Sequence, residues 1–120
     1  MKQNNRQIGS DYESKAAEYL ENNGYDILHR NLKNHGGEID IIALDNDDSL
    51  VFIEVKYRKN NQCGSPLDAV GLAKQRKICK AALLFLAANA EYYQYSIRFD
   101  VIGFEGKHLV HIKNAFEFVN

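Results

Sequence analysis

Two short hydrophobic runs, separated by a polar stretch, constrain the fold of this chain more than any other feature. The runs are Glu38–Leu44 and Leu50–Lys56, and in each of them charged residues stand among isoleucine, valine and leucine. Such runs are typical of β-strands. The polar residues Asp45–Ser49 between them have the composition and length of a loop that closes a β-hairpin. The sequence therefore predicts an antiparallel pair of strands.

The register of this hairpin would bring two carboxylates together. If Leu44 and Leu50 close the hairpin, Asp40 lies directly opposite Glu54. Opposed Cβ atoms in an antiparallel pair are only about 4.5–5.5 Å apart. Because two carboxylates at this separation repel each other and lose hydration, the pair needs a proton or a cation to neutralise it. A divalent metal ion is the expected neutralising group, and oxygen ligands without nearby Cys or His favour Mg²⁺ or Mn²⁺ over zinc.

The two faces of the hairpin are expected to differ. The alternation of side chains puts these charged residues on one face: Glu38, Asp40, Glu54 and Lys56. The opposite face carries only apolar residues and should be the core: Ile39, Ile41, Val51, Ile53 and Val55. A simpler alternative is an amphipathic hairpin whose polar face is merely hydrated, with Glu38 and Lys56 as an exposed ion pair. The sequence leaves both interpretations open.

Length and composition favour one compact domain over residues 1–120. The chain has one proline, and no apolar run approaches the roughly 20 residues that a membrane span needs. The polar N-terminus lacks the apolar region of a signal peptide, so we expect a cytoplasmic protein with no membrane partner. Cys63 and Cys79 belong to no CxxC motif, and we expect free thiols rather than a zinc module or a disulfide.

Basic residues are concentrated in one part of the chain. The net charge of −1 gives no basic footprint of the whole domain. Between positions 56 and 80, however, the only acid is Asp68, and the basic residues there are Lys56, Arg58, Lys59, Lys74, Arg76, Lys77 and Lys80. This basic tract predicts contacts with the phosphates of a nucleic acid, although a solvated helix face would explain it too.

A first helix is expected over residues 11–23. Ser10 and Glu13 have the spacing of a capping box, and Gly24 is a suitable left-handed stop. Glu13 continues the apolar stripe of Ala16, Ala17 and Leu20, so it should face inward. It then either bonds back to the amide of Ser10 or joins the acidic site.

A second helix is expected from Ser65 to about Asn89. Ser65 would be its N-cap and Pro66 its first residue. Lys74 falls within the apolar stripe of this helix, where a lysine must either snorkel or meet a buried acid. We expect Lys74 to reach the acidic site or its phosphate. Arg76, Lys77 and Lys80 should lie on the opposite flank, open to solvent.

The remaining segments predict further strands. Tyr25–Arg30, Ser96–Phe104 and His108–Ile112 have strand character, and Glu105–Lys107 is a turn between the last two. Arg98 and Asp100 share a face, so they can pair with each other or with neighbouring strands.

The order of these elements resembles the core of the PD-(D/E)xK nuclease superfamily, which has the restriction-endonuclease-like fold. The resemblance covers nearly the whole chain and is carried by Glu13, Gly37–Asp40, Phe52–Lys56, Lys74 and Arg98–Asp100. In this order the motifs are similar to those of the small bacterial YraN family of nuclease-like proteins, and the chain is identified as a member. The implied fold is α/β, a three-layer arrangement with a central mixed sheet flanked by helices. Ile39 stands where the name of the motif has proline, a variation that does not touch a ligand.

The resemblance also implies a site and an activity. Asp40 and Glu54 would bind Mg²⁺ (or Mn²⁺), and Glu13 would complete the site as in the similar Holliday junction resolvases. Lys56 would orient or polarise the attacking water, and Lys74 would contact the phosphate or another group of the site. The implied activity is that of a Mg²⁺-dependent endonuclease that hydrolyses DNA, including branched DNA, as a homodimer. The alternative is a noncatalytic nucleic-acid-binding or adaptor protein that retains the nuclease fold.

Overall fold

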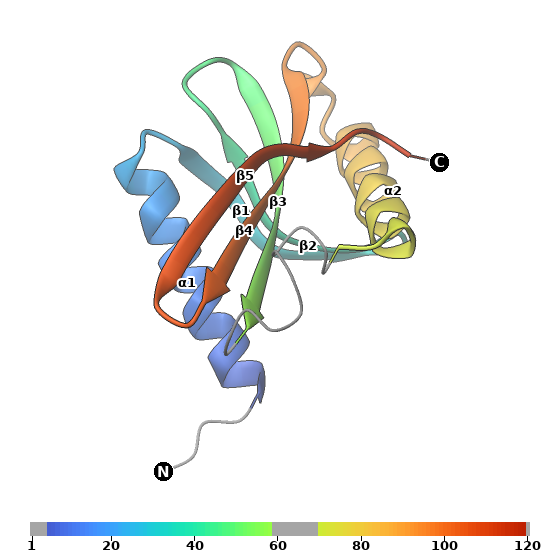
Figure 1. Cartoon of the computed structure of the whole chain (residues 1–120). Coiled ribbons are helices and arrows are strands. Elements are labelled where there is room, and N and C mark those ends of the chain that lie inside the picture. Colours follow the sequence, from blue (N-terminus) through green and yellow to red (C-terminus); the bar gives the residue numbers. More distant parts are fainter. Residues whose placement is uncertain (1–4, 59–69, 120) are drawn as a thin grey trace.

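The computed structural model describes residues 5–58 and 70–119. Its elements are α1 (Asn5–Asn22), β1 (Asp26–Asn34), β2 (Gly37–Leu44), β3 (Ser49–Arg58), α2 (Leu72–Ala88), the short 3₁₀ helix η2 (Ala90–Tyr92), β4 (Ser96–Glu105) and β5 (His108–Phe116). The strands form one five-stranded sheet in the order β1-β2-β3-β4-β5 (Figure 1). β3 and β4 are parallel, and the other neighbouring pairs are antiparallel.

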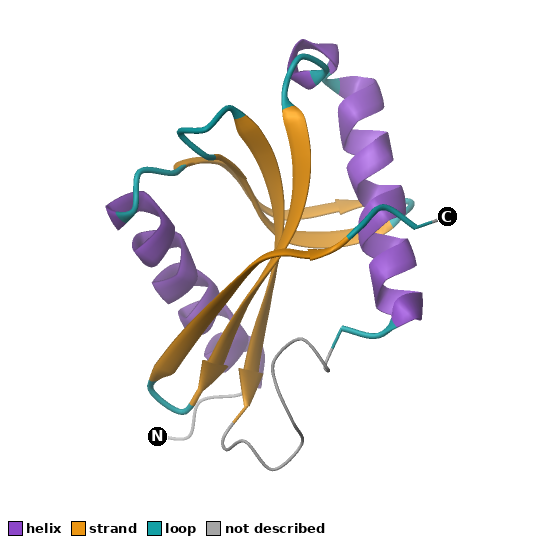
Figure 2. Cartoon of the chain, turned by 45° about the horizontal axis from the view of Figure 1, so that its top comes forward, coloured by secondary structure: helices purple, strands orange, loops and turns teal. Residues whose placement is uncertain are grey.

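The two long helices cover opposite faces of the sheet, which gives the molecule three layers (Figure 2). α2 lies between β3 and β4 in the chain, as a connection between parallel strands requires. The predicted α/β class and the restriction-endonuclease-like arrangement of a mixed sheet between helices are therefore confirmed. No helix within the described residues is long and apolar enough to cross a membrane.

Both faces of the β2–β3 hairpin are core, so the prediction of one apolar and one polar face is wrong. Ile42 and Phe52 pack against α2, in a cluster that includes Phe85. Ile41 and Val51 pack against α1 on the other face. The reason is that a sheet with a helix on each face must be apolar on both. Asp40 and Glu54 lie just beyond the paired part of the hairpin, which ends at Ile41 and Ile53.

The predicted register of this hairpin is confirmed over its closed part. The paired residues run from Leu44 opposite Leu50 to Ile41 opposite Ile53. The ladder stops there, one step before Asp40 and Glu54. Instead, the backbone N–H of Val55 donates to Oδ2 of Asp40 at 2.8 Å. The two acids therefore lie where β2 and β3 part, rather than in a closed cross-strand pair.

The N-terminal ends of both helices differ from the prediction. α1 begins at Asn5, so Ser10 lies inside the helix and cannot be its N-cap. Gly24 has a φ of 88°, which confirms the left-handed stop after α1. The N-cap of α2 is Gly71, whose φ of −72° and ψ of 172° are extended, and the helix starts at Leu72 rather than at Ser65. A glycine is a weak helix former and suits such a boundary. The predicted helix start at Ser65–Asp68 lies outside the described residues.

Arg98 and Asp100 do pair, and they anchor a buried polar network beneath α1. Nε of Arg98 donates to Oδ1 of Asp100 at 2.9 Å, and its Nη1 donates to Oδ2 of Asp45 at 3.0 Å. Asp100 is fully buried, and its Oδ2 lies 2.7 Å from Nε2 of His111. Burial by itself would raise the pKa of Asp100, but the hydrogen bonds from His111, Arg98 and Asn114 outweigh it, so the pKa is lowered. The network ties β4 and β5 to the turn of the β2–β3 hairpin.

Candidate metal and phosphate site

Glu54 is the buried centre of the candidate site. Only 5% of this residue is exposed, at the point where β3 leaves the ladder with β2. Its Oε1 lies 3.3 Å from Nζ of Lys56 and 3.7 Å from Nζ of Lys74. Lys74 of α2 therefore meets a buried acid, which is one of the two arrangements expected from its position in the apolar stripe.

Burial disfavours the ionisation of both Asp40 and Glu54, and the charge of Asp40 disfavours that of Glu54 further. Burial raises the pKa of Glu54, and the charge of Asp40 raises it further, whereas Lys74 and Lys56 oppose the shift. Burial also raises the pKa of Asp40, against the hydrogen bond from Val55 and the two lysines. The lysines offset part of the charge, so the two carboxylates form a strained pair that gains from an additional cation.

Glu13 approaches these acids from α1. Its Oε1 is buried and has no hydrogen-bond partner within the described part of the chain. Burial and the charge of Asp40 raise the pKa of Glu13 to about 7, although Arg30 opposes the shift. Because the capping interaction predicted from the sequence does not exist, Glu13 is left to the acidic site. Its unpartnered oxygen would be satisfied by a proton or a cation.

A polar cleft of about 470 Å³ opens between α1 and the β1–β2 hairpin. It is lined by Gly9, Ser10, Glu13, Asn31, Lys33, Glu38 and Asp40. Two of the candidate ligands, Glu13 and Asp40, thus face one cavity. The sequence reasoning assigned no role to Asn31 and Lys33, because it ended the first strand at Arg30. The sequence does carry a signal at Asn31: asparagine is unfavourable within a strand, so its presence there indicates an unusual backbone conformation.

Glu38 and Lys56 do not form the exposed ion pair that the simpler interpretation requires. Nζ of Lys33 lies 3.7 Å from Oε1 of Glu38, and Lys56 pairs with Glu54. Lys33 is the residue directly opposite Glu38 in the β1–β2 ladder. The partner of Glu38 thus comes from β1. The pairing of β1 with β2 could not be predicted from the β2–β3 hairpin alone.

The donor set suits a hard divalent cation. Glu13, Asp40 and Glu54 offer carboxylate oxygens, which Mg²⁺ and Mn²⁺ prefer. Within the described residues, Oε1 of Glu13 is a buried acceptor without a hydrogen-bond partner, and a cation there would satisfy it. The residues do not form a closed cage, because in residues 5–58 and 70–119 no group of three or more His, Cys, Asp or Glu converges on one point. The chemistry of the residues therefore fits an open site that lacks a complete set of protein ligands.

A protein-family model matches residues 12–104, from the first helix through most of β4. The model is that of "Uncharacterised protein family UPF0102". The chain belongs to the UPF0102 family. This finding confirms the membership predicted from the motifs, since the YraN proteins are members of this family.

Relatives of this UPF0102 chain come from distant bacteria. A UPF0102 protein of Fusobacterium nucleatum is 46% identical over 111 residues, 92% of each chain. One of Geobacter metallireducens is 46% identical over 121 residues, 98% of each chain. One of Chlorobium chlorochromatii is 50% identical over 97 residues, 81% of this chain and 73% of the relative. The matches therefore cover between 73% and 98% of the length of these three relatives.

A solved structure with a detectable likeness is that of EndoMS in complex with double-stranded DNA. It shares 17% sequence identity and a TM-score of 0.39, and the match covers 74% of this chain and 34% of the other. At this distance the likeness supports no conclusion about the UPF0102 chain.

The basic residues of the UPF0102 chain divide into two groups. Lys56 and Lys74 reach Glu54. Arg76, Lys77 and Lys80 lie exposed on α2, as predicted. Arg58 is half-buried at the end of β3, and Lys59 lies outside the described residues. The basic tract therefore does not gather as a whole around the carboxylates.

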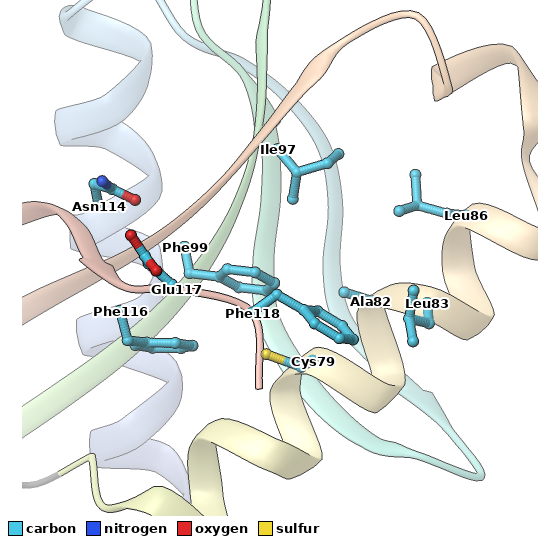
Figure 3. A pocket seen from close by; sticks show the side chains of 10 residues that line it. All are labelled: Cys79, Ala82, Leu83, Leu86, Ile97, Phe99, Asn114, Phe116, Glu117 and Phe118. Carbon is cyan, nitrogen blue, oxygen red and sulfur yellow. The ribbon is translucent and has the colours of Figure 1, made fainter. Parts of the chain in front are cut away.

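A second cavity, of about 450 Å³, lies between α2 and the strands β4 and β5. Figure 3 shows Phe99, Phe116 and Phe118 gathered beside Cys79 and Ala82 of α2. Cys79 is buried and unbonded to another cysteine, and burial raises the pKa of its thiol. This apolar cavity holds none of the candidate ligands, so it is separate from the acidic site of the UPF0102 chain.

Proposed function

We propose that this protein is a Mg²⁺- or Mn²⁺-dependent endonuclease that hydrolyses phosphodiester bonds of DNA, including branched DNA. The observation that carries the proposal is the position of the acids. Glu54 is buried between two lysines, Asp40 stands beside it, and Glu13 adds a buried oxygen without a partner. Glu13 and Asp40 also line a polar cleft, and a protein that keeps such an unfavourable set of charges beside a cleft is expected to use it.

Asp40, Glu54 and Glu13 are the residues that would hold the cation. When bound, Mg²⁺ offsets the charge that builds on the phosphate during attack and lowers the pKa of water. The contribution of the chain is to place charge around the reacting phosphate. Its carboxylates are already held in position, Asp40 by the amide of Val55 and Glu54 by its two lysines.

The two lysines have different proposed tasks. Lys56 lies two residues after Glu54 on β3, and its ammonium group contacts the Glu54 carboxylate. This ammonium group would donate a hydrogen bond to the attacking water and orient it. Lys74 comes from α2, approaches the same oxygen of Glu54, and would bind an oxygen of the phosphate. Their separate elements allow them to contact the nucleophile and the phosphate at the same time.

Metal binding and cleavage should both depend on Asp40. We expect Asp40→Asn to abolish the heat of Mn²⁺ binding in calorimetry, because the variant loses a charged ligand. Cleavage of labelled duplex and four-way junction DNA should fall at least about a hundredfold in Asp40→Asn and in Lys56→Ala. Asp26→Asn, at an exposed position that opens β1, is the matched control and should bind and cleave like the wild type.

Equal cleavage by the wild type, Asp40→Asn and Lys56→Ala would overturn the proposed activity. Circular dichroism and thermal melting show whether the variants remain folded. This matters because Asp40 is hydrogen-bonded to the backbone of β3.

A second candidate function is that of a noncatalytic nucleic-acid-binding or adaptor protein. Two observations favour it: the carboxylates of the described residues do not converge on one point, and α2 exposes three basic residues. In this case a triple change of Arg76, Lys77 and Lys80 to Gln should weaken DNA binding. The slope of log K against log salt should fall by about 0.9 for each lost phosphate contact.

The matched control for this triple variant removes the same charge elsewhere. Lys15, Lys107 and Lys113 are exposed on α1, on the β4–β5 turn and on β5. Their combined change to Gln should leave affinity nearly unaltered. Undiminished binding by the α2 variant, or an equal loss in both, would exclude α2 as the binding surface.

A further inference from the structure

Asn31 has a backbone conformation that the local structure does not require. Its φ is 55°, in the left-handed region, although it lies within β1. Two other described non-glycine residues have a positive φ, and each has an evident reason. Asp48 belongs to the turn between β2 and β3. Asn114 lies where the β4–β5 ladder shifts its register, and its amide donates to Asp100.

No comparable reason exists at Asn31. On either side of it the pairs are Arg30 with Ile41 and Leu32 with Ile39, so no residue is inserted and the register is kept. The ladder omits only the pair that Asn31 and Asp40 would form. Since β2 also lacks a pair between Asp40 and Glu54, the sheet is open on both sides of Asp40. A strained conformation that persists beside a candidate ligand suggests a functional constraint.

The side chain of Asn31 is exposed in the same cleft as Glu13 and Asp40. None of the hydrogen bonds recorded among the described residues uses its carboxamide. Asn34, on the same strand, shows the contrast, because its Nδ2 donates to the carbonyl of Ala81 at 3.0 Å and its Oδ1 accepts from Gly36. The amide of Asn31 is thus available to a ligand.

Lys33 adds a cation to this wall of the cleft. Among the described residues it pairs with one acid, Glu38, at 3.7 Å, and the two side chains are 64% and 59% exposed. Such an exposed pair contributes little free energy and can be exchanged for a better partner. The cleft therefore has acids from α1 and β2, together with an amide donor and an ammonium group from β1.

We infer that Asn31 and Lys33 form a phosphate-binding wall, on which the Asn31 carboxamide and the Lys33 ammonium donate to the oxygens of one backbone phosphate of the DNA strand. This inference rests on the proposed function, because it takes the ligand of the cleft to be a nucleic acid. Amide and ammonium donors are the usual protein partners of backbone phosphates, and they fix the position of the strand without reading its sequence. The left-handed backbone of Asn31 serves this role by opening the ladder at Asp40. Asn31 and Lys33 are then positioning residues on the β1 wall of the cleft, which α2 does not line.

The test is DNA binding by two substitutions of Asn31. Asn31→Asp keeps the shape and the tolerance for a positive φ but replaces the donor with a negative charge, so affinity for a fluorescent four-way junction should fall about tenfold. Asn31→Gly keeps the backbone conformation and removes only the carboxamide, and affinity should fall a few-fold. Asn46→Asp adds the same charge at an exposed position in the β2–β3 turn and should bind like the wild type.

Fluorescence anisotropy in the presence of EDTA separates this inference from the proposed activity, because no cleavage occurs. Affinities of Asn31→Asp and Asn31→Gly within about twofold of the wild type would overturn the inference, as would an equal loss in Asn46→Asp. Absence of DNA binding by the wild type would overturn it too. DNA binding that depends on Asn31, without any Mg²⁺-dependent cleavage by the wild type, would contradict the proposed activity alone.

Discussion

At the scale of single residues, Glu13 shows how the environment of a helix position can change the charge of its side chain. The chain extends α1 back to Asn5, so the Glu13 carboxyl has no free helix terminus to cap. It lies instead against Asp40 in a partly buried setting that raises its pKa to about 7. The native state therefore holds a proton on Glu13 at pH values where an ordinary glutamate has lost it.

This shift predicts how stability depends on pH. Between about pH 4.5 and 7 the native state binds more protons at Glu13 than the unfolded state, so in EDTA the free energy of unfolding should decrease as the pH rises. Glu13→Gln cannot titrate, and its stability should decrease less over the same range. Urea unfolding at about pH 5 and about pH 8 measures the difference.

Glu18→Gln, at an exposed position of α1, is the control and should follow the wild type. If Glu13→Gln loses as much stability as the wild type between the two pH values, the raised pKa of Glu13 is wrong. If the pKa is right, Mg²⁺ should restore more stability at the higher pH to the wild type than to Glu13→Gln.

At the scale of elements, the position of the site depends on how the β1–β2 turn packs on α2. A Cβ atom added at Gly36 would lie 2.6 Å from the backbone N of Ala81. One added at Gly37 would lie 3.3 Å from Cβ of Lys77. The absence of side chains at these positions lets the turn touch the helix, and the contact holds the strand that bears Asp40 against the helix that bears Lys74.

Gly36→Ala should therefore be destabilising. The neighbouring atoms belong to the backbone of α2 and cannot move aside cheaply, so we expect a loss of about 1–3 kcal/mol in the free energy of unfolding. Gly9→Ala is the matched control, because an added Cβ there meets nothing within 4 Å and Gly9 lies within α1. That change should stabilise by up to about 1 kcal/mol. Equal effects of the two substitutions in thermal or urea unfolding would contradict the close contact.

At the scale of the whole molecule, the proposed action on branched DNA makes a demand on assembly. A four-way junction has two equivalent strands to cut, so one chain with one site is insufficient for a symmetric reaction. We predict that the protein is a homodimer, at least when it is bound to a junction. Light scattering after gel filtration, with and without a four-way junction, measures the mass directly.

A mass equal to one chain under both conditions would contradict junction cleavage by a symmetric pair. It would leave cleavage of a single strand open, because the carboxylates and lysines of the candidate site all come from one chain.

Much of the local structure could be predicted from the sequence, because it depends on neighbours along the chain. The alternation of apolar residues and the polar loop define the hairpin that pairs Leu44 with Leu50, and Gly24 marks the end of α1. The apolar stripe of α2 places Lys74 where it must either snorkel or meet a buried acid, and the structure shows that it meets Glu54. The resemblance to the family added the prediction that Glu13 is a metal ligand and the prediction of a three-layer fold.

The rest was decided by the tertiary structure, because it depends on contacts between segments that are distant in sequence. Only the helices on both faces of the sheet explain why Ile42 and Ile41 are both buried. Only the pairing of β1 with β2 gives Glu38 its partner Lys33 and opens the ladder between Asn31 and Asp40. The sequence by itself predicted the acids and lysines on which the proposed function depends. The packing of α1, β1 and α2 around one end of β2 and β3 decided how these residues are charged, buried and exposed to a ligand.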